Sequence, residues 1–396
     1  MATNILDLPL DLMALIAKHV INIMDFARAR AVCREWQSVF SLENYSPLSQ
    51  DCVPWLMLAE REDSDIRGLF NPSTSEVYDI PLPELWQKKI VGSAHGWVVT
   101  IGEDLEIHLY NPLTRVQIKL PPQTNFGYDT SSWSPSDVRD YFLKKVVLFS
   151  SPSKGDCMAL AVYNDYDVAA IARPGDEVWT TLGGTKDWRL FQDYIHYMGN
   201  IYAIDIHGGF GMFDFSSEPK TIKLGSLPPL PINVDDKWNY WDRHKKYLVE
   251  LSGDLLVIVR RVYNVFDSDI LIDDDEDFTV PEVVIRYKTV YFKIYKLYQL
   301  QPEVEWVELK DLGDYSLFVG KNTSFSVKAS QAGAWWRRNC IYFTDDCFED
   351  FGTRKPNEIQ AHDQGVYNLE DQSFQLHYQG TSSSHYSPPI WFTPGL

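Results

Sequence analysis

Leu69-Phe70-Asn71-Pro72-Ser73-Thr74 recurs as Leu109-Tyr110-Asn111-Pro112-Leu113-Thr114, with the two Asn-Pro pairs 40 residues apart. Each copy is followed by a second β-like run that ends in prolines, Ile80-Pro81-Leu82-Pro83 and Ile118-Lys119-Leu120-Pro121-Pro122. This order predicts a strand, an Asn-Pro turn, a second strand and a connection. A period near 40 residues is typical of the four-stranded blades of a β-propeller. A pair of β-sandwiches would not produce this period, so a propeller is the favoured architecture.

Weaker copies of the same pattern continue downstream. Asn200-Ile201-Tyr202-Ala203-Ile204-Asp205 leads into Gly211-Met212-Phe213-Asp214-Phe215, and Asn339-Cys340-Ile341-Tyr342-Phe343-Thr344-Asp345 leads into Gly365-Val366-Tyr367-Asn368-Leu369. Radial repetition explains such short strands, because a propeller leaves only short and protected sheet edges. We predict about six units, with five or seven left open, near residues 53–83, 90–122, 144–184, 188–226, 245–310 and 315–378.

Residues 5–40 have a helical period instead. Pro9 suits the first turn of a helix, where its missing N–H costs nothing. Two sets of apolar residues then follow at helical spacing, the second after Asp25, a predicted N-cap: Leu12, Leu15, Ile16 and Val20, then Phe26, Ala29, Val32, Cys33, Trp36 and Phe40. A module of two or three helices is too small to bury all these side chains alone, which indicates a partner. The chain is therefore predicted to be multidomain, α then all-β.

Composition and charge narrow the classes of function. Apolar residues make up 45% of the chain and aromatic residues 14%, as expected for a globular, β-rich protein. The formal net charge of −19 repels phosphate backbones and anionic lipid, so nucleic acid is not an expected partner. No apolar segment approaches the ~18 residues of a membrane span, so no membrane association is expected. The five cysteines form no regular framework, and the N-terminus has no secretory signal pattern, which indicates reduced thiols in the cytosol or nucleus.

Residues 5–40 resemble the F-box. The resemblance rests on Leu8-Pro9-Leu10-Asp11-Leu12, on Ile16, and on Arg30-Ala31-Val32-Cys33-Arg34-Glu35-Trp36 about 20 residues later. It implies that a Skp-type adaptor binds here and docks the chain on a cullin–RING ligase. The matching residues would form the adaptor-binding face or the small core behind it: Leu8, Pro9, Leu12, Ile16, Val32, Cys33 and Trp36. Apolar contact would supply most of the affinity, with Pro9 and Trp36 as anchors.

The remainder resembles the plant F-box family with a C-terminal KIB-type β-propeller. The segments that carry this resemblance are the first Asn-Pro-x-Thr turns, Ser93-Ala94-His95-Gly96-Trp97, Leu312 to Gly320, Asn339 to Asp346, and Trp391-Phe392-Thr393-Pro394. It implies an F-box module at 1–45 and a substrate-binding propeller at 50–396. The expected function is the substrate-recognition subunit of an SCF-type (Skp–cullin–F-box) ubiquitin ligase, without catalytic residues, that bridges the adaptor to a protein substrate. Family membership transfers no particular substrate.

Four segments could carry further chemistry. The mixture of aromatic and cationic side chains in Trp335-Trp336-Arg337-Arg338 is favoured at binding hot spots, which makes this the candidate substrate-binding segment, although it also suits a blade edge with Arg stacked on Trp. Seven carboxylates within 267–277 lack the spacing of a Ca²⁺ loop, and favour a solvated hairpin tip over a docking strip for a basic partner.

His207-Gly208-Gly209-Phe210-Gly211 partly matches the oxyanion loop of esterases, but no Gly-x-Ser-x-Gly accompanies it, so a tight turn with positive φ is predicted. Cys340 and Cys347 lack two further zinc ligands, and His362 alone does not complete a site; core thiols are favoured. No cofactor or metal is expected.

Two other functions remain open on the sequence. One is an F-box protein that binds the adaptor as a regulatory partner without substrate turnover. The other is a propeller enzyme, a hydrolase or lyase, whose catalytic groups would have to converge from distant loops because no local motif supplies them. Loss of Pro9 and Trp36 should abolish adaptor binding in either F-box protein but spare an enzyme's activity.

Overall fold

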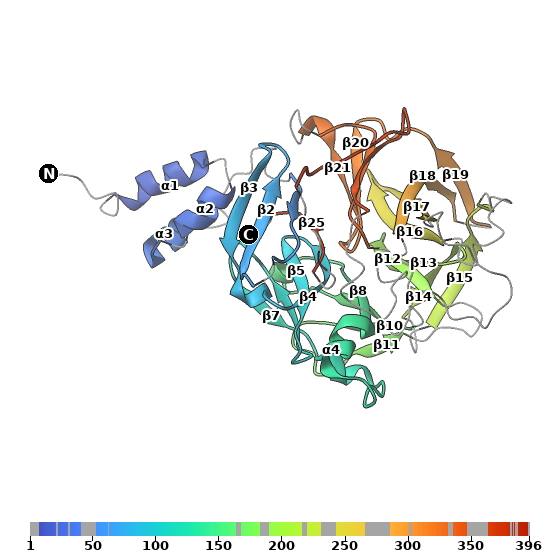
Figure 1. Ribbon diagram of the computed structural model, residues 1–396, viewed down its shortest axis with the longest axis horizontal. Helices are drawn as coiled ribbons and strands as arrows, with labels where there is room; N and C mark the ends of the chain where they lie inside the picture. Colours follow the sequence, from blue (N-terminus) through green and yellow to red (C-terminus); the bar gives the residue numbers. More distant parts are fainter. Residues whose placement is uncertain are drawn as a thin grey trace.

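A computed structural model shows how the chain is arranged (Figure 1). The structure describes residues 8–20, 23–30, 32–40, 53–61, 63–163, 168–182, 190–215, 220–230, 243–265, 286–300, 303–331, 336–346, 363–380, 382, 384 and 387–394. Three helices at the N-terminal end precede six separate β-sheets. The sheets are arranged around a common centre as the blades of a propeller, so the predicted count of six is confirmed.

Each blade is built almost entirely from one continuous stretch of chain. The strands of the first three blades are β25 (Ile390–Phe392), β1 (Trp55–Met57), β2 (Ile66–Asn71) and β3 (Glu76–Pro81); β4 (Lys89–Ala94), β5 (Trp97–Ile101), β6 (Ile107–Tyr110) and β7 (Gln117–Lys119); β8 (Leu143–Leu148), β9 (Ala159–Tyr163), β10 (Val168–Ala172) and β11 (Thr180–Leu182). A short helix, α4 (Pro135–Asp137), precedes β8.

The last three blades include the longest strands. They are β12 (Phe191–Tyr197), β13 (Asn200–Asp205), β14 (Gly209–Asp214) and β15 (Lys220–Ser226); β16 (Arg243–Leu251), β17 (Asp254–Val265), β18 (Arg286–Gln299) and β19 (Glu305–Leu309); β21 (Phe325–Lys328), β20 (Tyr315–Val319), β22 (Cys340–Phe343), β23 (Gly365–Asn368) and β24 (Phe374–Gln375). All six units lie close to the ranges predicted from the repeat.

The two Asn-Pro turns occupy the same place in consecutive blades. Asn71 ends β2 and Asn111 follows β6, and in both blades the next strand is the outermost one. The Asn71 side-chain oxygen accepts from the Ser73 backbone N–H at 2.9 Å, and that of Asn111 accepts from Leu113 at 3.0 Å. The asparagine side chain therefore closes both turns, while proline restricts the backbone φ angle of the following residue position. These local roles explain why the Asn-Pro dipeptide identifies the repeat.

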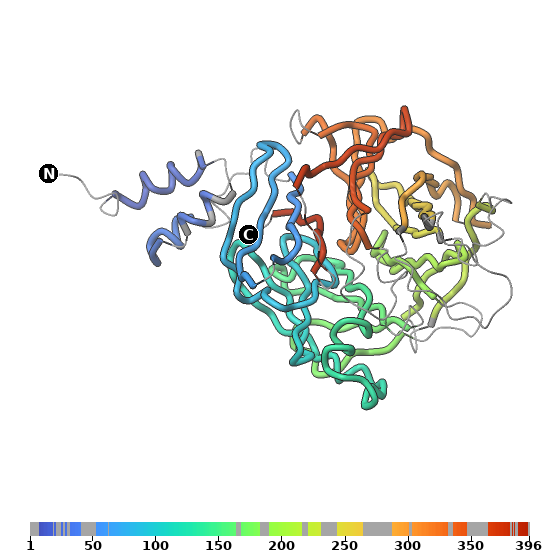
Figure 2. The backbone as a smooth tube through the Cα atoms, viewed as in Figure 1, coloured from blue at the N-terminus to red at the C-terminus, as the bar shows by residue number. Residues whose placement is uncertain are grey.

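The C-terminal strand closes the ring. β25 pairs antiparallel with β1, with Leu56 opposite Trp391, so the first blade combines both ends of the propeller sequence. Figure 2 shows the terminal segment returning beside the first blade. Trp391 is fully buried, and its ring lies 5.1 Å from that of Phe318 in blade six. The sequence-based boundaries missed this closure, because the first unit was placed at 53–83 alone.

Blade six departs from the regular order. β20 and β22 are parallel neighbours, and β21 pairs with the other edge of β20. The loop between β20 and β21 reaches inner strands of other blades: the Thr323 N–H donates to the Ser93 carbonyl at 2.9 Å. The loop begins at Gly320, whose φ of +149° and position against Thr344 leave no room for a Cβ atom. Lys321, the next residue, is buried.

His377 packs against the closing strand. Its ring lies 5.0 Å from that of Trp391. Its Nε2–H donates a hydrogen bond to the Phe343 carbonyl oxygen at 3.2 Å. Although part of the residue is exposed, its Nδ1 is buried without a hydrogen-bond partner among the described residues. Burial lowers the pKa of His377 to about 4, and the bond to Phe343 only partly opposes this.

We expect acidification from pH 6.5 towards pH 4 to destabilise the fold through His377. The unfolded chain takes up a proton on this side chain below about pH 6.5, whereas the folded chain keeps it neutral, so the effect reaches about 2 kcal/mol near pH 5. Denaturant unfolding of wild type and His377→Gln at pH 7.5 and pH 5 measures it. The wild type should lose more stability than the variant; equal losses would contradict a buried neutral histidine.

Candidate functional sites

The N-terminal helices pack around a small apolar core. They are α1 (Leu10–His19), α2 (Ile23–Arg30) and α3 (Arg34–Val39). The core consists of Met13, Ala17, Phe26, Val39 and Phe40. The Phe40 ring is stacked on that of Trp36 at 5.4 Å and meets that of Phe26 edge-on at 5.2 Å. No helix in the described residues is long and apolar enough to cross a membrane.

The opposite side of this module exposes apolar side chains. On α1, Leu12, Leu15 and Ile16 are each about half exposed, at 48%, 54% and 46%. Their three- and four-residue spacing places them on one face of the helix, whereas Met13 and Ala17 face the core. Val32, between α2 and α3, is 52% exposed. We call Leu12, Leu15 and Ile16 the apolar helix face.

The seven residues predicted to contact the adaptor divide into two groups. Pro9, Leu12, Ile16 and Val32 are exposed, and Leu8, Cys33 and Trp36 are partly buried. Because Trp36 packs against the core, it supports the module from within more than it offers a contact surface. The sequence had left open whether each of these residues lies on the adaptor-binding face or in the small core behind it.

The module has three helices, within the predicted two or three: α2 ends at Arg30, and the extended Cys33 precedes α3. One detail of the helical prediction was wrong. Asp25 is not an N-cap: it lies in the first turn of α2, where its carboxylate is 3.2 Å from the Arg28 guanidinium. A carboxylate there still suits the positive end of the helix dipole.

The candidate substrate-binding segment does not form one surface. Trp336 is 5% exposed and packs edge-on against Phe318 and Tyr342 at 5.0 and 4.8 Å, so its prediction as a binding residue is corrected to a core residue of blade six. Arg337 and Arg338 are exposed, and Arg337 donates to the Gln375 side chain. Trp335 lies outside the described residues. Arg337 and Arg338 remain candidates for contact with a substrate, and the prediction for Trp335 stays untested.

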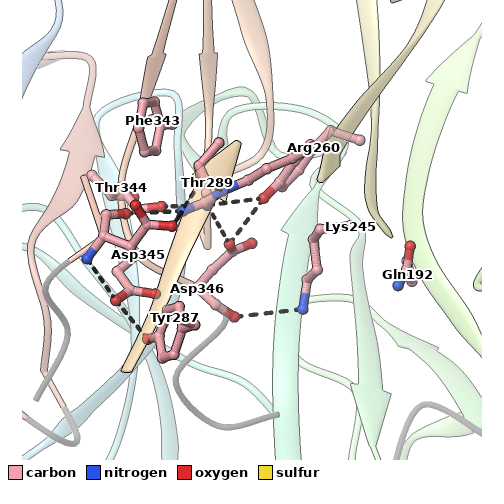
Figure 3. A network of polar contacts seen from close by, with 12 residues as sticks. Gln192, Lys245, Arg260, Tyr287, Thr289, Phe343, Thr344, Asp345 and Asp346 are labelled. Atoms are coloured by element: carbon pink, nitrogen blue, oxygen red, sulfur yellow. Dashed lines mark hydrogen bonds and ion pairs between the residues drawn. The ribbon is translucent and has the colours of Figure 1, made fainter. Parts of the chain in front are cut away.

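A buried polar network lies inside the ring, centred on Arg260 of β17 (Figure 3). Arg260 is fully buried, and its guanidinium lies 3.0 Å from Asp346 and 2.9 Å from Asp363. Its Nε donates to the Thr289 hydroxyl at 2.7 Å, and it donates further to backbone carbonyls of Thr344 and Asp363. One side chain thus joins strands β17 and β18 to the segment that ends at Asp346 and to the segment that begins at Asp363.

The carboxylates of this network differ in their surroundings. Burial, reinforced by the nearby Asp363, raises the pKa of Asp345, which accepts from Tyr287 at 2.6 Å. Burial also favours the neutral form of Asp346, yet the cations of Lys245, Arg260 and Lys145 hold the pKa of that carboxyl below its ordinary value. The electrostatic potential around Asp346 is therefore positive.

A pocket adjoins this network at the centre of the ring. Its lining includes four lysines, one carboxylate and two other polar side chains: Lys144, Lys145, Lys245, Lys321, Asp346, Gln192 and Tyr247. Sequence reasoning missed this group. The available signal was paired cations inside apolar strand runs, such as Lys144-Lys145 before Val146-Val147-Leu148. The fold brings together side chains from four blades that no sequence spacing connects.

The remaining candidate motifs are structural where the structure describes them. Gly208 has φ of +84° in the turn between β13 and β14, as predicted, and the Asp205 carboxylate accepts from His207 and Gly209 there. Burial raises the pKa of the free thiols Cys157 and Cys340 to about 11, which makes them inert core thiols. No group of potential metal ligands occurs within the described part of the chain.

The acidic residues 267–277 lie outside the described residues, as do Cys347 and His362. The strands that flank the acidic segment pair antiparallel, with Val265 opposite Arg286, so it connects the two strands of a hairpin.

These features define a six-bladed β-propeller protein preceded by a helical module with an exposed apolar face. The chain belongs to the KIB1-4 beta-propeller family, whose model matches residues 69–368. It is similar to the F-box protein SKIP23 of Arabidopsis thaliana, with 25% identity over 98% of this chain and 95% of that protein. It is also similar to the F-box/kelch-repeat protein KIB1 of the same plant, with 24% identity over 87% of this chain and 78% of the relative.

Solved structures are more distant. A protein of unknown function from Bacteroides caccae covers 86% of this chain with 11% identity and a TM-score of 0.37. This similarity is too low to add to the assignment.

Proposed function

We propose that this chain is the substrate-recognition subunit of an SCF-type ubiquitin ligase. The observation that carries the proposal is the apolar helix face, attached to a propeller whose relatives bear the name F-box protein. The similarity to SKIP23 spans 98% of the chain and so extends into the helical module. In this proposal the helices at 1–45 bind a Skp-type adaptor, and the propeller at 50–396 holds a protein substrate.

The apolar helix face suits a protein partner. Leu12, Leu15, Ile16 and Val32 lie about half exposed on a module whose own core already buries Met13, Ala17, Phe26, Val39 and Phe40. Further burial of the face needs a second molecule, and removal of apolar surface from water would favour that association. Pro9 extends the same exposed region at the start of α1.

The chain contributes position rather than catalysis in this proposal. In this proposal the ring of six blades holds a substrate in the same complex as the adaptor, which raises the effective concentration of the substrate near the ubiquitin-charged enzyme. The free thiols Cys157 and Cys340 suit a reducing compartment, and we propose the cytosol or the nucleus.

We expect Ile16→Asp to weaken adaptor binding at least about thirtyfold, because a charge would be buried in an apolar contact. Isothermal titration of the purified chain with a Skp-type adaptor measures the dissociation constant. Leu376→Asp is the matched control, since Leu376 is 60% exposed on the propeller and should leave the constant within about twofold. Equal constants for wild type and Ile16→Asp would exclude the apolar helix face as the contact.

Ubiquitin transfer distinguishes a receptor from a regulatory adaptor-binding protein. The full chain is combined with adaptor, cullin, RING protein and ubiquitin-charging enzymes, together with the proteins that co-purify with the chain. A receptor directs ubiquitin to a co-purifying protein, and Ile16→Asp abolishes this transfer. Adaptor binding without transfer to any captured protein would favour the regulatory role, and activity on a small substrate that survives Ile16→Asp would favour a propeller enzyme.

A further inference from the structure

Exposed apolar side chains gather at one end of blades four and five. Met198 and Tyr298, at 75% and 70%, are the most exposed large apolar residues in the part of the chain that the structure describes. Met198 lies in the turn between β12 and β13 of blade four, and Tyr298 lies near the end of β18 in blade five. Phe215, 44% exposed, follows β14 of blade four. A single exposed apolar side chain is ordinary, whereas a group of them indicates a contact surface.

Hydrogen bonds and strand pairing show that these side chains share one end of the two blades. The Tyr197 hydroxyl donates to the Gly253 carbonyl oxygen at 2.6 Å, so the β12–β13 turn adjoins the turn between β16 and β17. Asp254, which begins β17, lies 2.6 Å from the ammonium group of Lys296, two residues before Tyr298. In blade four, β13 and β14 pair antiparallel, so the end of β14 lies beside the start of β13 and the same turn. We call Met198, Phe215 and Tyr298 the blade-end patch.

Met198 occupies a backbone conformation that suits other residues better than methionine. Tyr197 pairs with Asn200, which leaves a two-residue turn between them. Its residues Met198 and Gly199 have φ of +48° and +80°, as in a type I′ turn, where asparagine is preferred at the first position. A bulky apolar residue in the left-handed region costs stability. Because the Met198 side chain is so exposed, packing within the chain does not explain it, and a contact with another molecule does.

A bulge turns Tyr298 outward. The pairing of β18 with β19 shifts between Leu297 and Gln299, so Tyr298 is the extra residue. Such a residue has no partner on the neighbouring strand, and bulges commonly re-aim a side chain in this way. Leu297 packs against the core between blades four and five, whereas Tyr298 is exposed. The strand therefore presents an aromatic ring to solvent and keeps the packing of the preceding residue.

Carboxylates place negative charge beside the patch. Glu250, before the β16–β17 turn, and Glu305, in β19, are exposed. Burial raises the pKa of the Tyr197 hydroxyl, and the carboxylates of Asp254 and Glu250 add to this effect, so both lie close to the β12–β13 turn. Lys296 is paired with Asp254. Three carboxylates against this one lysine leave a net negative charge, which attracts a cationic partner.

We propose that the blade-end patch binds a basic segment of a partner protein that also carries aliphatic side chains. The cationic groups of the segment pair with Glu250 and Glu305 and lie over the Tyr298 ring, whose face attracts cations. Its aliphatic side chains contact Met198 and Phe215, and methionine adapts its shape to such contacts. The inference rests on the proposed function in one respect: in a substrate receptor, this segment belongs to the substrate.

The test uses the full chain and a fluorescently labelled peptide of alternating arginine and leucine residues. Fluorescence anisotropy at low salt should give a dissociation constant below about 100 μM, which rises with added sodium chloride. Two control peptides separate the contributions: serine in place of leucine removes the apolar contact, and glutamine in place of arginine removes the charge. Each control peptide should bind at least about fivefold more weakly.

Met198→Asn is the most informative variant, because asparagine suits the positive φ of the turn. It should keep or raise the denaturant concentration at the unfolding midpoint, while it weakens peptide binding at least about fivefold. Tyr298→Ser should weaken binding to a similar extent, and Glu250→Gln about threefold. Leu376→Asn and Glu76→Gln are the matched controls, because both residues are exposed on other blades, and binding should stay unchanged.

Binding of the Skp-type adaptor provides an independent readout. Met198→Asn should bind the adaptor like wild type, since the blade-end patch and the apolar helix face lie on different parts of the chain. Peptide binding without adaptor binding would contradict the proposed function and support the patch. Adaptor binding without peptide binding would overturn the patch alone, as would wild-type peptide affinity in the folded Met198→Asn and Tyr298→Ser variants.

Discussion

Trp391→Ala should lower the free energy of unfolding by about 3–5 kcal/mol, the range for removal of a large buried aromatic side chain. Trp391 is fully buried in β25, the strand that joins the two ends of the propeller. Its ring contacts Phe318, Tyr342 and His377 at centroid distances of 5.1, 5.9 and 5.0 Å. The variant would leave a cavity between blades one and six. It would also weaken the packing of the closing strand β25.

Denaturant unfolding, followed by tryptophan fluorescence and circular dichroism, measures this loss. Trp86→Ala is the matched control, because Trp86 is 42% exposed and its removal should cost less than about 1 kcal/mol. Trp391→Phe should lie between the two, since a smaller ring keeps part of the contact area. If Trp391→Ala and Trp86→Ala unfold at the same denaturant concentration, closure by β25 does not stabilise the ring.

Arg260→Met should lower the free energy of unfolding by a similar amount, about 3–5 kcal/mol, for an electrostatic reason. Methionine fills similar space, but it leaves the buried Asp346 and Asp363 without the cation that lies 3.0 and 2.9 Å from them. Thr289 also loses its guanidinium partner. Denaturant unfolding at neutral pH measures this loss, and the expected result is a large fall in the denaturant concentration at the unfolding midpoint.

A double comparison separates charge from packing at this position. Arg115→Met is the control, because Arg115 is half exposed beside Glu84 and should change stability by less than about 1 kcal/mol. Arg260→Met combined with Asp346→Asn and Asp363→Asn should be more stable than Arg260→Met alone, since the two carboxylates that lose the guanidinium are then neutral. An equal or greater loss in the triple variant would contradict this explanation.

Most of the fold could be predicted from the 40-residue repeat. The Asn71-Pro72 and Asn111-Pro112 turns could be found because asparagine and proline each serve a local conformation, and local chemistry is visible in sequence. Once their spacing was known, the other units followed from alternating aromatic strands. The pairing of β25 with β1 could not be found in this way, because it joins residues more than 300 positions apart. The parallel pairing of β20 with β22 in blade six was hidden for a similar reason, because β21 lies between these two strands in the sequence.

Some of the candidate site residues could be predicted from the sequence and others could not. The helical period at 5–40 identified the residues of the apolar helix face, although it could not separate the exposed Ile16 from the inward Trp36 without the packing of three helices. The arginines and aromatics of 335–338 looked alike as surface candidates, but Trp336 is needed to fill blade six. The central pocket was invisible, because its lysines become neighbours only when the ring closes and a bulge turns Lys144 inward.

The most direct test of the central claim is the molar mass of the chain mixed with a purified Skp-type adaptor, measured by light scattering during size-exclusion chromatography. We predict one complex with one copy of each protein. The double variant Leu12→Asp and Ile16→Asp, with unfolding behaviour like that of wild type, should elute apart from the adaptor. If wild type also elutes apart from the adaptor at micromolar concentration, or if the double variant still forms the complex, the chain is not an F-box receptor that binds through the apolar helix face.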